Sequence, residues 1–69
     1  MFLVNFMNKS QNFIVNDNVT LLSAIANFNK DLSNKTIKNY IKYKKVMVND
    51  KVITNSSFLL NKGDNVIIS

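Results

Sequence analysis

The spacing of apolar and polar residues divides the first half of the chain into strands followed by a helix. Apolar runs at 2–7 and 12–16 flank the polar tetrapeptide 8–11, and this arrangement predicts two strands joined by a hairpin loop. From residue 19 the apolar period changes from strand-like to helical. Spacings of three and four residues then predict a first helix of about ten residues, which buries Leu21, Leu22, Ile25 and Phe28. Either Thr20 or Asn18 is placed to cap its first turn.

The second half predicts another helix and three strands. Ser33 offers an N-terminal cap for a helix from Asn34 to Tyr43. Two strands follow at 46–48 and 51–54, joined by Asn49-Asp50, a dipeptide that tolerates the positive φ of a tight turn. Gly63, the only glycine, belongs to the turn before a closing strand at 65–69. The order β-β-α-α-β-β-β predicts a small α+β fold, with two helices packed on one face of an antiparallel sheet.

Length and composition limit the chemistry of the chain. Its 69 residues predict a single domain, 1–69, although this domain could also be the N-terminal part of a longer protein. The chain contains no Cys and no His, so we expect no disulfide, no metal site and no cofactor. No apolar run approaches the roughly 18 residues of a membrane span, and the N-terminus lacks a basic segment of the secretory type. We therefore expect a cytoplasmic protein with no membrane partner.

The same residues argue against catalysis in this chain. The four aspartates are separated by at least 14 residues, and each lies beside a turn or loop where a capping role suffices. No carboxylate pair, nucleophile–base pair or phosphate-binding glycine loop can be assembled. We expect neither an enzyme nor a binder of small-molecule substrates.

The positive charge is concentrated in one third of the chain. The whole net charge of +5 lies between residues 30 and 51, where seven lysines oppose Asp31 and Asp50. The remaining lysines and aspartates cancel. Such a cluster indicates a polyanionic partner, and the cluster consists of Lys30, Lys35, Lys38, Lys42, Lys44, Lys45 and Lys51.

Helical geometry aligns three of these lysines. At 100° per residue, Lys35, Lys38 and Lys42 fall within about 60° of one another, opposite Ile37 and Ile41. Such a face can be the ordinary solvated side of an amphipathic helix. No acidic residue lies three or four positions after any of these lysines, and this favours a nucleic acid instead, because solvated faces usually mix both signs. If the helix packs beside the following hairpin, all seven lysines form one surface.

Aromatic and amide side chains accompany the lysines. Asn39 could bind a base or ribose edge, and Tyr43 could stack on an unpaired base. The alternative for Tyr43 is a partly buried ring that covers the hairpin. The phenylalanines at 2, 6, 13, 28 and 58 occupy strand or helix positions and are predicted to be packing residues.

Residues 32–68 resemble the RNA-binding domain named after ribosomal small-subunit protein four, the S-four domain. Three blocks carry the resemblance: Leu32-Ser33-Asn34-Lys35-Thr36-Ile37-Lys38-Asn39-Tyr40-Ile41-Lys42, Val46-Met47-Val48-Asn49-Asp50-Lys51-Val52-Ile53 and Leu60-Asn61-Lys62-Gly63-Asp64-Asn65-Val66. A looser match at 13–15 and 20–22 resembles the lead-in of this domain in large-subunit pseudouridine synthases of the RluA/RluD type. Residues 1–11 have no diagnostic match.

The resemblance implies a fold in which two helices and a hairpin, the αL motif, present a basic concave surface to structured RNA. Two departures from the family pattern imply weaker or more permissive binding. Asn34 stands where an arginine fork is usual, and Asp50 replaces the glycine of the hairpin turn. The family's RNA-facing positions correspond here to Ser33, Asn34, Lys35, Lys38, Lys42, Asn49 and Lys51, to which the charge argument adds Asn39, Tyr43, Lys44 and Lys45.

Three functions remain open at this point. The first is a monomeric module that binds structured ribosomal RNA and targets an rRNA pseudouridine synthase whose catalytic domain lies elsewhere. The second is a ubiquitin-like (β-grasp) sulfur carrier or protein-interaction domain, although such carriers end in Gly-Gly and this chain ends in Ile68-Ser69. The third is a structural accessory domain whose lysines only maintain solubility.

Overall fold

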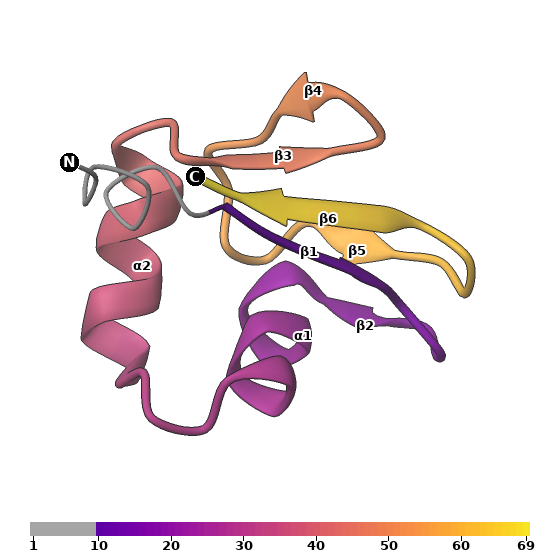
Figure 1. Cartoon of the computed structure of the whole chain (residues 1–69), viewed down its shortest axis with the longest axis horizontal. Coiled ribbons are helices and arrows are strands. Elements are labelled where there is room, and N and C mark those ends of the chain that lie inside the picture. Colours follow the sequence, from indigo (N-terminus) through magenta and orange to yellow (C-terminus); the bar gives the residue numbers. More distant parts are fainter. Residues whose placement is uncertain (1–9) are drawn as a thin grey trace, which may run out of the picture.

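The computed structural model describes residues 10–69 and has the α+β architecture that the sequence predicts (Figure 1). Its helices and strands follow in the order β1 (Gln11–Ile14), β2 (Val19–Thr20), α1 (Leu21–Phe28), α2 (Asn34–Lys42), β3 (Val46–Val48), β4 (Lys51–Val52), β5 (Leu59–Leu60) and β6 (Asn65–Ile68). The strand predicted at 2–7, and therefore its hairpin with 12–16, lies outside the described residues.

The strands form two antiparallel sheets rather than one. Four of them are arranged in the order β1-β6-β3-β4, so the closing strand β6 lies inside the sheet between β1 and β3. Separately, β2 pairs with β5 through Val19↔Leu60 and Thr20↔Leu59. The sequence pattern predicts neither of these two-residue strands, because it places Val19 and Thr20 at the start of the first helix.

Local signals set the starts of both helices as predicted. The hydroxyl of Thr20 accepts a hydrogen bond from the amide of Ser23, and the hydroxyl of Ser33 accepts one from the amide of Thr36, both at 3.2 Å. These bonds satisfy N–H groups that have no partner within the helix. The predicted β3–β4 turn is also confirmed, because Asn49 and Asp50 have φ values of 50° and 70°.

Aliphatic side chains from both helices and both sheets make up the core. Among residues 10–69 no buried side chain is polar or charged. The helix α2 contributes Ile37 and Ile41 to this core, while its C-terminal end leads directly into β3 (Figure 1). The largest fully buried side chains are those of Leu21, Ile25, Ile37, Ile41, Val46, Leu60 and Val66.

The phenylalanines do not fill the core in the way that was predicted. Phe28 and Phe58 are 42% and 37% exposed. Phe28 instead stacks on Phe13, with ring centroids 4.2 Å apart and planes 9° from parallel. The expectation was wrong for Phe28 and Phe58 because branched aliphatic side chains already fill the small interior. Phe2 and Phe6 lie outside the described residues.

Truncating the buried face of α2 should unfold the domain. We expect Ile37→Ala to lower the free energy of unfolding by about 2–5 kcal/mol, since Ile37 is fully buried. A core of this size rarely supplies more than about 3–5 kcal/mol, so much of the variant should be unfolded at 37 °C. Urea denaturation followed by circular dichroism measures the loss.

The control for this prediction is Leu59→Ala, because Leu59 is 73% exposed. Its free energy of unfolding should change by no more than about 0.5 kcal/mol. Equal destabilisation by the two substitutions would show that α2 is not anchored through Ile37.

Candidate nucleic-acid interface

The helix α2 presents three of the predicted lysines on its solvent-facing side. Lys35, Lys38 and Lys42 are exposed, whereas Ile37 and Ile41 on the opposite side are buried in the core. The described part of the chain thus confirms the predicted division of this helix into a cationic and an apolar face. Because the buried isoleucines fix the rotation of α2 about its axis, the lysines cannot turn inward without exposing the core.

Backbone hydrogen bonds terminate α2 in a Schellman motif. The amide of Lys45 donates to the carbonyl of Tyr40 at 2.9 Å, and the amide of Lys44 donates to that of Ile41 at 3.2 Å. Lys44 has a φ of 65°, in the left-handed region where this motif usually has glycine. A lysine therefore stands where the backbone would favour a residue without a side chain, and such a departure marks a candidate functional position.

Tyr43 lies at the end of α2 with its ring in solvent. The residue is 61% exposed, so the alternative of a partly buried ring covering the hairpin is wrong. The ammonium nitrogen of Lys42 lies 5.6 Å from the ring centroid, within the range of a cation–π contact. Lys44 and Lys45 are also exposed, so cations flank the ring on both sides along the chain.

The hairpin lysine is separate from the lysines of the helix. Lys51 pairs with Val48 at the turn of the β3–β4 hairpin, and this turn lies at the end of the hairpin remote from α2 (Figure 1). Lys30 lies before α2, in its connection with α1. Lys35, Lys38 and Lys42 lie on the exposed side of α2, and the exposed residues Lys44 and Lys45 follow at its C-terminal end. We call these five residues the lysine face. Lys51 is separated from Lys45 by the length of the three-residue strand β3, which is roughly 10 Å.

Two of the predicted RNA-facing residues also make hydrogen bonds within the fold. The Asn49 amide donates through Nδ2 to an Asp64 oxygen at 3.1 Å, and its Oδ1 accepts from the Asn65 amide at 3.0 Å. The Ser33 hydroxyl accepts from the Thr36 amide and donates to the Thr36 hydroxyl at 3.0 Å. These bonds hold both side chains in place, but they leave one N–H of Asn49 Nδ2 and one lone pair of the Ser33 hydroxyl unused. A role of either residue in binding RNA stays a prediction.

The remaining amides of the predicted site are exposed. Asn34 begins α2 and Asn39 lies on its solvent side, next to the lysines. Their side chains have no hydrogen-bond partner among residues 10–69. Both side chains are therefore available to a ligand, whereas the Asn49 side chain already makes two hydrogen bonds.

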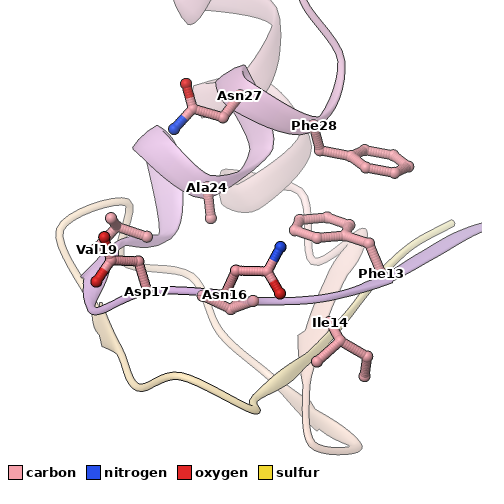
Figure 2. Close-up of a pocket in the computed structure, with 9 residues that line it drawn as sticks. Phe13, Ile14, Asn16, Asp17, Val19, Ala24, Asn27 and Phe28 are labelled. Atoms are coloured by element: carbon pink, nitrogen blue, oxygen red, sulfur yellow. The ribbon is translucent and has the colours of Figure 1, made fainter.

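A cleft that the sequence did not indicate lies between β1, the segment 15–18 and α1 (Figure 2). Its volume is about 390 Å³. Among the described residues that line it, Asp17 is the only ionisable one, so they supply no pair of groups for acid–base chemistry. None of the predicted site residues belongs to the lining, which consists of Phe13, Ile14, Val15, Asn16, Asp17, Val19, Ala24, Asn27 and Phe28.

The described residues contain neither a metal-binding cluster nor a membrane-spanning helix. Within 10–69, no three Asp or Glu side chains come together as a metal site would require, and the chain has no His or Cys. Neither α1 nor α2 is long and apolar enough to cross a membrane. No protein-family model matches the chain, and a comparison with curated proteins finds no match either.

Acid should weaken the loop that Asp64 organises. A hydrogen bond from the Asn61 amide at 2.8 Å and a second from Asn49 lower the pKa of the Asp64 carboxyl below its ordinary value of 3.8. A carboxyl with a lowered pKa stabilises the folded state above pH 3.8 and loses that contribution as the pH falls through the folded pKa. Thermal unfolding between pH 2 and pH 6 measures this loss.

The matched variant for this test is Asp64→Asn, which cannot ionise. It should be less stable than the wild type at pH 6, because an amide cannot accept both hydrogen bonds. The difference between the two proteins should shrink as the pH falls below about 4. A difference that is constant across this range would contradict the role of the carboxylate.

Replacing Lys44 should show that its backbone is strained. A side chain in the left-handed region costs about 1–2 kcal/mol, and the freedom of glycine in the unfolded chain offsets about 0.5–1 kcal/mol of the gain. We therefore expect Lys44→Gly to raise the free energy of unfolding by about 0.5–1 kcal/mol. Lys44→Ala removes the same charge but keeps the Cβ, so it should not stabilise. Equal stabilisation by both variants would attribute the effect to charge repulsion.

Proposed function

We propose that this chain is an RNA-binding module that docks on the phosphate backbone of structured ribosomal RNA through the lysine face. The observation that carries the proposal is the single-sign charge of α2, whose exposed side has lysines and no carboxylate while its other side is fixed in the core. Lysine is a point charge that binds phosphate without reading sequence. The expected specificity is therefore for the shape and charge of an RNA.

The likeness to the S-four domain gives the proposal its biological setting. That likeness suggests that the module targets an rRNA pseudouridine synthase in the cytoplasm and that catalysis belongs to another domain. Two features of the structure are consistent with this role. The helix α2 leads directly into the β3–β4 hairpin, and the side chains of the lysine face are exposed to solvent. Asn34, at the position of the usual arginine, offers only an amide, so the affinity should depend mainly on the lysines.

The β-grasp alternative has less support. Ile37 and Ile41 of α2 are fully buried, so the second helix is an integral part of the core. Such a helix has no obvious place in a carrier of this size. The accessory-domain alternative gives no reason for the concentration of the net charge at 30–51, nor for a lysine at a φ of 65°.

Reversing one charge of the lysine face should weaken RNA binding at least about tenfold, which is 1.4 kcal/mol. The variant is Lys38→Glu, with a base-paired ribosomal RNA stem as ligand and fluorescence anisotropy as the measurement. For the wild type, contacts from three to five lysines predict that the logarithm of affinity falls with the logarithm of salt with a slope of about −2 to −4. Circular dichroism should be unchanged, since Lys38 is exposed.

The control is Lys62→Glu, which changes the net charge by the same amount on a turn outside the lysine face. It should lower the affinity much less than Lys38→Glu. Equal losses would assign the binding to net charge alone, and a wild-type salt slope near zero would refute the proposed function.

A further inference from the structure

Tyr43 is an aromatic residue that does not pack on the core formed by the described part of the chain. Its ring is 61% exposed, and the apolar side chains that pack on the core include Tyr40 but not Tyr43. Tyr40 and Tyr43 are three residues apart, yet only Tyr40 packs on the core. A large exposed ring with no packing role is a candidate binding group.

The backbone around this ring is held in place from both sides. The Tyr43 amide donates to the carbonyl of Asn39 at 2.9 Å, and the Schellman bonds of Lys44 and Lys45 lock the next two residues. The ring therefore projects from a fixed point at the C-terminal cap of α2, in the connection to β3. A ligand that stacks on this ring would order little more than the side-chain rotamer, which keeps the entropic cost of binding low.

The surroundings of the ring select the chemistry of the ligand. Lys42 lies over the ring at 5.6 Å from its centroid, and Lys44 and Lys45 follow directly in the chain. An aromatic surface among cations suits a nucleotide, because the ring can stack on the base while the ammonium groups bind the phosphates. A base inside a continuous duplex has both faces covered by its neighbours, so only an unpaired base can use this surface.

We propose that Tyr43 is a stacking platform for an unpaired nucleobase, and that Lys42, Lys44 and Lys45 hold the phosphates on either side of it. The module then prefers structured RNA with an unpaired nucleotide beside a stem over a continuous duplex. This inference rests on the proposed function, since the lysine face supplies the binding to the stem. It adds a recognition element that lysine charge alone does not provide.

The test uses two RNAs that differ in one nucleotide. The first is a blunt-ended duplex with a single unpaired 2-aminopurine, and the second is the same duplex without that nucleotide. We expect the wild type to bind the bulged RNA about 5- to 150-fold more tightly, the range of one stacking contact. Binding should also quench the 2-aminopurine fluorescence, because stacking on the ring quenches it.

Two variants isolate the ring. Tyr43→Phe keeps the stacking surface and should retain both the preference and the quenching. Tyr43→Leu keeps an apolar side chain without a π face, so it should bind the bulged RNA no better than the duplex, with its affinity for the duplex unchanged. Since Tyr43 is exposed, both variants should fold, which circular dichroism checks.

The possible results separate this inference from the proposed function. If the wild type binds both RNAs equally and with a clear salt slope, the lysine face binds RNA and the stacking platform is refuted. The platform is also refuted if Tyr43→Leu keeps the preference for the bulged RNA. If neither RNA binds in a salt-dependent way, the proposed function fails and the platform fails with it.

Discussion

The burial of Ile37 and Ile41 determines how the rest of the surface is presented. These side chains lie one helical turn apart on α2 and are almost completely removed from solvent. Their packing fixes the rotation of α2, so Lys35, Lys38 and Lys42 can only face outward. Any other rotation would raise the free energy of the folded state, because turning the lysines toward the core would bury ammonium groups and expose two large apolar side chains. The cationic face is thus a consequence of the hydrophobic core.

The helix termini add a second constraint at both ends of this surface. Ser33 starts α2 through its hydroxyl, and the bonds of Lys44 and Lys45 close it. The helix has only nine residues and would be marginal in isolation, so caps and packing together stabilise it. At the C-terminal end, the cap also fixes the backbone of Tyr43 and of the lysines that follow it. The chain thereby combines termination of the helix and presentation of its charged groups in the same four residues.

Sequence patterns predicted the parts of the fold that depend on neighbouring residues. The caps at Thr20 and Ser33, the positive φ of the Asn49-Asp50 turn and that of Gly63 at 97° all follow from local chemistry. The pairing of β2 with β5 could not be predicted, since two-residue strands 40 positions apart have no periodicity of their own. The bond between Asn49 and Asp64 depends on the same long-range arrangement. For the site, helical geometry correctly predicted the exposed lysines, whereas the hydrogen bonds of Asn49 within the fold had no local signal.

The aspartates at positions 17 and 64 organise turns and do not lie on the lysine face. Asp64 accepts from the Asn61 amide and from Asn49, and Asp17 accepts from the Asn18 amide at 2.9 Å. The loops of these two residues are tied together, because the Asn18 side chain accepts from the Lys62 amide at 2.9 Å. Both carboxylates are thus used to organise turns at one end of the sheet, and no carboxylate lies on α2. Because the only charged side chains of α2 itself are lysines, its exposed side presents a positive field to a polyanion.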